Sequence, residues 1–314
     1  MSTIAVFPGQ GAQSVGMGRD LAEACPAARE VFAIVDEALG EPLSRLVFAG
    51  PAAALTLTEN AQPALLATSL AAVRALEAAS GRPLAELVDY VAGHSLGEYS
   101  ALVAAGALAL ADAARLLRLR GRAMQAAVPV GAGAMAAVLG LDVPAVERVA
   151  AEAAGDGVCA LANDNGEGQA VLSGDAAAVT RAVQLAKAAG AKRALLLQVS
   201  APFHCALMAP AAAELGAALA RTTFHAPRVP LLANVTAAPV HEAAALPELL
   251  REQVTARVRW RESMARMREL GATRLVEFGQ GKVLTGLARR DLPGVALVNI
   301  QGPEDVAAFV AGLG

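Results

Sequence analysis

A serine flanked by two glycines is the residue whose setting points most directly to chemistry. Gly93-His94-Ser95-Leu96-Gly97 follows an apolar run that ends at Ala92 and leads into a helical pattern from Glu98. A strand, a tight turn and a helix are the setting in which a G-x-S-x-G serine acts as a nucleophile. The following helix N-terminus supplies free N–H groups that can stabilise an oxyanion. The sequence therefore predicts a serine nucleophile for acyl transfer, with an ordinary glycine-rich turn as the alternative.

A serine hydroxyl needs an adjacent general base, and histidine is the usual one. The chain has four histidines: His94 lies inside the pentapeptide, and His225 and His241 lie in loop-like stretches. His204 directly follows an expected buried strand and precedes a helix. Functional groups in α/β folds collect at this edge of the sheet. Position therefore favours His204 as the base, with a histidine that caps its own helix as the alternative.

Strand and helix patterns alternate along the chain, and these elements must position the serine and its base. Short apolar runs predict buried strands at Ile4–Phe7, at the run ending at Ala92, at Arg274–Phe278 and at Val295–Ile300. Such alternation favours an α/β fold with a mostly parallel sheet covered on both faces. Helical patterns cover about 18–39, 59–79, 96–105, 110–126, 205–220, 246–256, 260–270, 283–290 and 303–312.

The segment 134–198 follows a different pattern from the rest of the chain. Its order is strand, helix, strand, strand, helix, strand, which is typical of a ferredoxin-like unit. We interpret it as a small subdomain inserted into a larger α/β domain. The predicted division is 1–130 and 199–314 for the large subdomain and 131–198 for the small one.

Composition excludes several classes of function. The 314 residues are 55% hydrophobic and 3% aromatic, with a net charge of −3 and no block of like charge. These values give no indication of a nucleic-acid or membrane partner. Three cysteines without metal-binding spacing predict no disulfide framework and no metal site, and they fit a reducing compartment. The first residues lack a signal-peptide pattern, so we expect a cytoplasmic protein.

Several segments together resemble one family and cover nearly the whole chain in the family's order. The chain is similar to malonyl-CoA:acyl carrier protein transacylases and, more broadly, to the acyltransferase domains of fatty-acid and polyketide synthases. The resemblance implies an α/β-hydrolase-like large subdomain with an inserted ferredoxin-like small one. The matching residues are Phe7-Pro8-Gly9-Gln10-Gly11-Ala12-Gln13, Gly93-His94-Ser95-Leu96-Gly97-Glu98-Tyr99, Arg120-Gly121, Gly133-Ala134-Met135, Gly168-Gln169, Phe203-His204 and Gly281-Lys282-Val283-Leu284.

The resemblance also implies a set of catalytic roles. Ser95 is the nucleophile, and His204 is the general base and acid. The main-chain carbonyl of Gln253 orients His204 in place of the usual acidic residue. The backbone N–H groups of Gln10 and Leu96 form the oxyanion hole.

Two further residues are implied to bind the acyl group. Arg120 holds the free carboxylate of a malonyl group, because a guanidinium can donate two parallel hydrogen bonds to it. Phe203 fits family members that accept malonyl, since a bulky side chain leaves little room for an α-methyl branch. Asn163 falls where the family has a polar residue, without an assigned role, and Gln280 replaces a common proline. Spacing alone does not select Arg120 from its neighbours Arg115, Arg118 and Arg122.

The implied reaction is a two-step transfer from malonyl-CoA to a phosphopantetheinylated acyl carrier protein through a malonyl-serine. No permanently bound cofactor is expected, and coenzyme A enters as the substrate thioester. We expect a monomer that meets its carrier in trans, in fatty-acid synthesis, polyketide synthesis or malonate metabolism. Two other hypotheses remain: a serine esterase or thioesterase that uses water as the acceptor, and a non-catalytic carrier-docking module.

Overall fold

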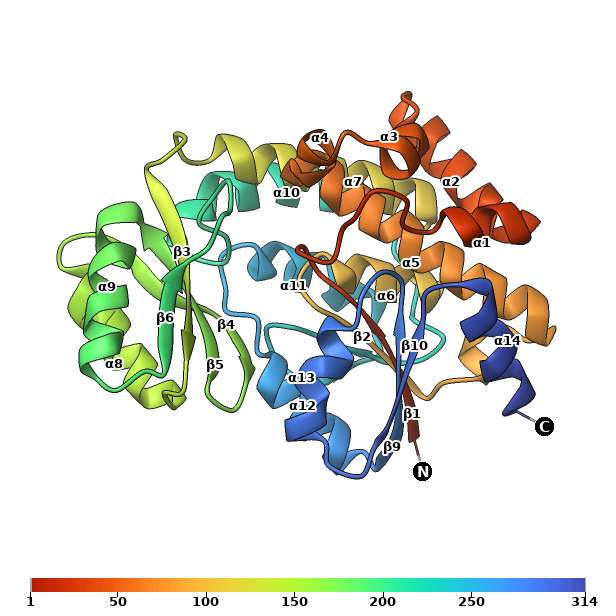
Figure 1. Cartoon of the computed structure of the whole chain (residues 1–314). Helices are drawn as coiled ribbons and strands as arrows, with labels where there is room; N and C mark the ends of the chain where they lie inside the picture. Colours follow the sequence, from red (N-terminus) through yellow and green to blue (C-terminus); the bar gives the residue numbers. More distant parts are fainter. Residues whose placement is uncertain (1, 314) are drawn as a thin grey trace.

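A six-stranded sheet forms the centre of the large part of the molecule (Figure 1). The structure is a computed structural model that describes residues 2–313. Strand order is β10-β9-β1-β2-β7-β8, and only β7 and β8 pair antiparallel. The bounds are Ser2–Phe7 for β1, Tyr90–Gly93 for β2, Leu231–Leu232 for β7, Pro239–Val240 for β8, Ala272–Phe278 for β9 and Ala296–Ile300 for β10.

Helices cover both faces of this sheet, as the continuous apolar strands predict. In β1, Ala5 and Phe7 pack into the core formed with α2, α5 and α7, whereas Ile4 and Val6 pack against α12 and α13. The helices are α1 Arg19–Ala24, α2 Pro26–Leu39, α3 Leu43–Ala49, α4 Ala52–Thr56, α5 Thr58–Ser80, α6 Gly97–Ala104, α7 Leu110–Ala126, α10 Ala209–Leu219, α11 Leu246–Gln253, α12 Trp260–Glu269, α13 Val283–Asp291 and α14 Pro303–Ala311, with 3₁₀ turns η1 Leu84–Glu86, η2 Ala206–Met208 and η3 Ala243–Ala245.

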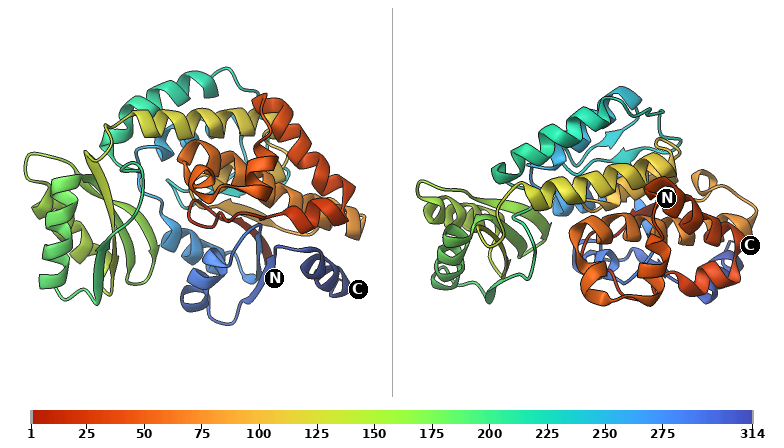
Figure 2. Two further views of the ribbon diagram at one scale, coloured as in Figure 1. Left: turned by 45° about the horizontal axis from the view of Figure 1, so that its top comes forward. Right: turned by 90° about the horizontal axis from the view of Figure 1, so that it is seen from above.

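A separate antiparallel sheet stands at one end of the molecule (Figure 2). Its order β4-β5-β3-β6 is the ferredoxin-like order, and its own apolar core includes side chains of α8 and α9. The predicted α/β class with a small antiparallel unit is therefore confirmed. The bounds are Gly133–Leu139 for β3, Val143–Ala154 for α8, Cys159–Gly166 for β4, Gln169–Asp175 for β5, Ala176–Ala188 for α9 and Arg193–Leu196 for β6.

The structure differs from the sequence prediction in a few elements. The helix predicted over about 18–39 is two helices, because extended Cys25 separates α1 from α2 and Pro26 begins α2. Helices α3 and α4 and the two-residue strands β7 and β8 were not predicted, and such short elements carry little periodicity. No helix within residues 2–313 is long and apolar enough to cross a membrane.

Candidate active site

The two glycines of the pentapeptide allow a sharp turn at Ser95. Ser95 has a φ of 53°, in the left-handed region that non-glycine residues rarely occupy. A Cβ on Gly93 would lie 1.9 Å from the Gly97 carbonyl oxygen, and one on Gly97 would lie 2.2 Å from the Phe7 oxygen. Only glycine fits at these two positions, so β2 can turn directly into α6 and present the serine at the sheet edge.

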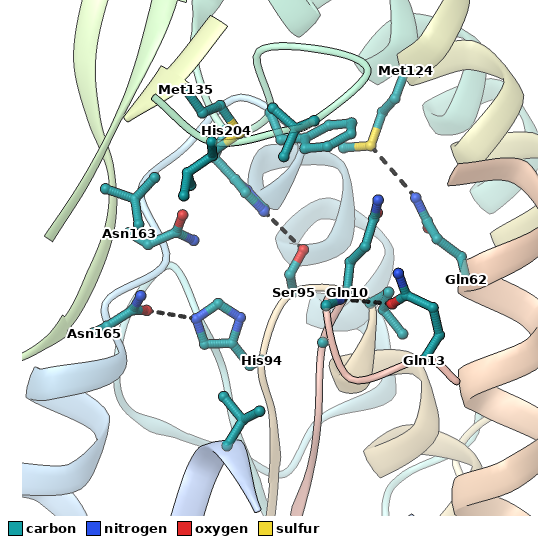
Figure 3. Close-up of a pocket in the computed structure, with 18 of the residues that line it drawn as sticks. Gln10, Gln13, Gln62, His94, Ser95, Met124, Met135, Asn163, Asn165 and His204 are labelled. Carbon is teal, nitrogen blue, oxygen red and sulfur yellow. Dashed lines mark hydrogen bonds between the residues drawn. The ribbon is translucent and has the colours of Figure 1, made fainter. Parts of the chain in front are cut away.

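Ser95 and His204 lie in direct hydrogen-bonding contact (Figure 3). The Ser95 Oγ is 2.8 Å from Nε2 of His204, and His204 Nδ1 is 2.8 Å from the main-chain oxygen of Gln253. A carbonyl oxygen only accepts, so Nδ1 carries the proton and Nε2 is free to accept from the serine. This is the tautomer that a general base requires.

The surroundings of His204 keep its imidazole neutral. His204 is 4% exposed, and burial lowers its pKa to about 3, with the positive charge of Arg120 as the next cause. A neutral imidazole can accept the serine proton without first losing its own. The charge of Arg120 therefore affects the base as well as the neighbouring hydroxyl.

Two backbone N–H groups are available beside Ser95. Gln10 and Leu96 line the same cavity as Ser95. Within residues 2–313, neither main-chain N–H donates a hydrogen bond to the protein. Leu96 also stands at the start of α6, where the helix dipole is positive. The geometry offers two free donors to a developing oxyanion.

Arg120 reaches Ser95 from α7. It is 2% exposed, and its Nη2 donates to Ser95 Oγ at 3.1 Å and to Gln253 Oε1 at 2.9 Å. Its Nη1 donates to Oε1 of Gln62 at 2.9 Å, and its guanidinium lies 5.9 Å from the centre of the Tyr99 ring. No carboxylate contacts this guanidinium among the described residues, so it retains capacity for an anionic ligand.

The other three arginines of α7 have acidic partners away from the serine. Arg115 pairs with Asp112, Arg122 pairs with Glu59, and Arg118 pairs with Glu41. None of the three lines the cavity. The tertiary structure thus separates Arg120 from neighbours that spacing alone did not distinguish.

A cavity of about 370 Å³ opens between the two sheets, and Ser95, His204 and Arg120 line it. Phe203, Met124 and Met135 supply apolar surface near Ser95, and Asn163 adds an amide from β4. His94 also lines the cavity, but its Nε2 contacts Asn165 Oδ1 at 2.8 Å instead of Ser95. No group of three or more potential metal ligands occurs within residues 2–313.

Sequence reasoning gave no role to three residues that contact this site. Gln62 contacts Arg120, Asn234 contacts the Ser95 turn, and Glu98 contacts both Asn234 and Gln253. Asn234 closely follows β7 at the functional edge of the sheet, and Glu98 directly follows the pentapeptide. Their positions were visible in the sequence, but their partners lie up to 155 residues away.

Fold and site define a serine acyltransferase class, and comparison with known proteins gives the family. The acyl transferase domain family matches residues 4–292, so this chain belongs to that family. It is 46% identical to the malonyl CoA-acyl carrier protein transacylase of Bacillus subtilis over 98% of this chain and 96% of that protein. It is also 46% identical to the transacylase of the same name from Escherichia coli over 96% and 97%.

Solved structures agree over the full length. The acyl-carrier-protein-S-malonyltransferase of Bartonella henselae superposes with a TM-score of 0.97 at 52% identity, covering 100% of this chain and 99% of that one. A malonyl-transacylase in complex with its type II PKS acyl-carrier protein superposes with a TM-score of 0.95 at 41% identity, covering 99% and 100%. Both subdomains therefore belong to the shared architecture.

Proposed function

We propose that this chain transfers a malonyl group from coenzyme A to the phosphopantetheine thiol of an acyl carrier protein. The enzyme is a malonyl-CoA:acyl carrier protein transacylase that works through a malonyl ester of Ser95. The observation that carries the proposal is the Arg120 guanidinium, 3.1 Å from Ser95 Oγ and without an acidic partner among the described residues. A hydroxyl nucleophile beside a free buried cation suits an acyl group with a carboxylate at its far end.

In the first half-reaction, Ser95 Oγ attacks the thioester carbon while His204 Nε2 takes the hydroxyl proton. The Gln10 and Leu96 N–H groups stabilise the oxyanion, and the Gln253 carbonyl stabilises the imidazolium through Nδ1–H. Collapse breaks the C–S bond and releases the thiol of coenzyme A, which takes the proton from His204. Arg120 turns the Nη2 hydrogen bond that Ser95 Oγ accepts toward the malonyl carboxylate and keeps the one that Gln253 Oε1 accepts.

The second half-reaction reverses these steps with a different thiol. The phosphopantetheine thiol gives its proton to His204 and attacks the malonyl ester through the same oxyanion hole. The Ser95 C–O bond then breaks, and Ser95 Oγ recovers the proton. Because the acceptor must reach a serine at the bottom of the cavity, a long flexible thiol arm suits this site.

Several expectations about the assembly remain predictions. We expect a cytoplasmic monomer that meets its carrier in trans, with no permanently bound cofactor. Arg257, Arg259 and Arg261, or Arg289 and Arg290, are candidates for a basic surface that faces an acidic carrier, with ordinary surface charge as the alternative. In the structure Arg257, Arg259 and Arg261 pair with Glu147, Glu262 and Asp164, respectively.

The decisive experiment is the intact mass of the protein after a brief mix with malonyl-CoA. We expect a malonyl-sized gain on the native chain, no gain on Ser95→Ala, and transfer of the group when a phosphopantetheinylated carrier is added. Release of free malonate without carrier dependence would instead support a thioesterase. No adduct with either malonyl-CoA or acetyl-CoA would leave the carrier-docking module as the better description.

A further inference from the structure

Three carboxylates are fully buried within residues 2–313, and Glu98 is the one beside the nucleophile. Asp164 forms an ion pair with Arg261, and Glu277 accepts N–H bonds at the start of α13. Glu98, in the first turn of α6, is 1% exposed and has no ion pair within the same range. Burying an unpaired carboxylate is costly, so its hydrogen bonds must offset a large loss of hydration.

The two side-chain oxygens of Glu98 accept hydrogen bonds from two segments, and both segments also contact the backbone of Ser95. Oε1 accepts the main-chain N–H of Asn234 at 3.3 Å, and Oε2 accepts a hydrogen bond from Nε2 of Gln253. Asn234 follows β7, and Gln253 ends α11. Burial raises the pKa of Glu98 to about 8, while both hydrogen bonds and the Arg120 charge oppose that rise. One side chain therefore links two segments that are also joined directly, by a hydrogen bond of 3.5 Å from Gln253 Nε2 to Asn234 Oδ1.

Asn234 spans the turn that presents the nucleophile. Its Oδ1 accepts the Ser95 N–H at 2.7 Å, and its Nδ2 donates to the Gly93 oxygen at 2.6 Å. These bonds satisfy the Gly93 carbonyl and the N–H of Ser95 itself, the residue held at a φ of 53°. Asn234 can make both side-chain hydrogen bonds only if its main chain is fixed. Glu98 helps to fix it by accepting the main-chain N–H of Asn234.

Gln253 connects the same carboxylate to the base and to Arg120. Its Nε2 donates to Glu98 and to the Ser95 carbonyl at 2.9 Å, so its Oε1 faces Arg120 Nη2 at 2.9 Å. If the amide turned over, its NH₂ group would meet the guanidinium, and two donors would face each other. Glu98 and the Ser95 carbonyl together thus select the amide orientation that supports Arg120.

We propose that Glu98 is a positioning residue that holds Asn234 and Gln253, and through them sets the geometry of Ser95 and the orientation of Arg120. The inference rests on the proposed acyl transfer and adds a residue that touches neither substrate nor the reacting atoms. Its effect on acyl selectivity passes through the side-chain amide of Gln253. Its effect on the nucleophile passes through Asn234.

Glu98→Gln tests the proposal because glutamine keeps the shape of the side chain but has only one oxygen that can accept a hydrogen bond. We measure the rate of Ser95 acylation by intact mass with malonyl-CoA and with acetyl-CoA. Acylation should fall roughly tenfold with acetyl-CoA and roughly a hundredfold with malonyl-CoA, because only malonyl also uses Arg120. Glu277→Gln is the matched control, since it alters a buried carboxylate on β9 and should leave the malonyl-to-acetyl ratio unchanged.

Gln253→Ala supplies the second arm, because it removes the amide but keeps the carbonyl that binds His204. It should lower the malonyl-to-acetyl ratio by itself, and adding Glu98→Gln should lower that ratio no further. If Glu98→Gln does not fold, a lowered malonyl-to-acetyl ratio in Gln253→Ala still supports the step from the Gln253 amide to Arg120. A ratio equal to that of the native chain overturns it.

Two outcomes would overturn the positioning role. The first is a malonyl-to-acetyl ratio in Glu98→Gln that equals that of the native chain. The second is that Glu98→Gln lowers this ratio by the same factor in Gln253→Ala as in the native chain. The native chain is assayed in parallel, and an absent malonyl-serine adduct there would instead contradict the proposed function itself.

Discussion

Arg120 Nη2 lies 3.1 Å from the Oγ of Ser95 and donates a hydrogen bond to it. Both partners belong to a network in which His204 Nε2 contacts the same Ser95 oxygen at 2.8 Å. The guanidinium therefore has three effects in this site. It can bind a carboxylate, it favours the serine oxygen as an anion, and it disfavours a positive charge on the imidazole.

Arg120→Ala should reduce acylation by malonyl-CoA far more than by acetyl-CoA. We expect a loss of roughly a hundredfold or more with malonyl, because a charge-assisted bidentate contact is removed, and a smaller loss with acetyl. Single-turnover mass measurements with both thioesters provide the ratio. Arg115→Ala, an exposed arginine of the same helix, is the control and should leave both rates native. Equal losses for both thioesters would exclude the carboxylate-binding role.

The rate of acylation should not fall near pH 6.5, where an ordinary histidine becomes protonated. The pKa of His204 is lowered to about 3 by burial and then by Arg120, so the neutral base persists as the pH falls through 6.5. We expect the single-turnover rate to change by less than about twofold between pH 7.5 and pH 5.5. A tenfold decline over that range would show a pKa in the normal range and contradict the interpretation.

The pH dependence of acylation in Arg120→Ala tests whether the charge of Arg120 contributes to the lowered pKa of His204. Removing the positive charge should raise the pKa of His204, although burial keeps it below the ordinary value. The acidic limb of the variant should therefore lie at higher pH than that of the native chain. An unchanged limb would mean that burial alone accounts for the lowered pKa.

Phe203 should restrict branched acyl groups. This residue is 9% exposed and lines the cavity together with His204. Phe203→Ala makes room for an α-methyl group, and we expect the ratio of methylmalonyl to malonyl acylation to rise roughly tenfold. Competition between the two thioesters, read by intact mass, gives this ratio. A native ratio in a folded variant would assign the restriction to another side chain.

Gly97→Ala should destabilise the protein through the backbone alone. The added Cβ would meet the Phe7 oxygen at 2.2 Å, so β1 or α6 must shift, and we expect a loss of about 2 kcal/mol. Gly286→Ala is the matched control, because a Cβ added to this exposed glycine of α13 would point into open space and alanine favours helix there. Urea unfolding of both variants gives the comparison. Equal stabilities would refute the packing argument.

Local patterns in the sequence located most of the elements and the candidate nucleophile Ser95. The glycines around Ser95, the apolar runs and the strand-helix order each depend on neighbouring residues, so they can be read along the chain. The ferredoxin-like unit was predicted in this way, and the structure gives four antiparallel strands in the matching order. The strand pair β7–β8 was missed because a two-residue strand depends on contacts with other segments. The break at Pro26 was missed although proline is a local signal for the start of a helix.

The sequence by itself determined the fold class and, through family resemblance, the family and the candidate residues Ser95, His204 and Arg120. Only the tertiary structure decided which arginine of α7 faces the serine, because Arg115, Arg118 and Arg122 find acidic partners elsewhere. It also revealed Glu98 as the shared anchor of Asn234 and Gln253, which lie 136 and 155 residues further along the chain. The physical reason is range: propensity and periodicity act between neighbouring residues, whereas a buried polar side chain forms hydrogen bonds with whichever donors the folded chain brings to it.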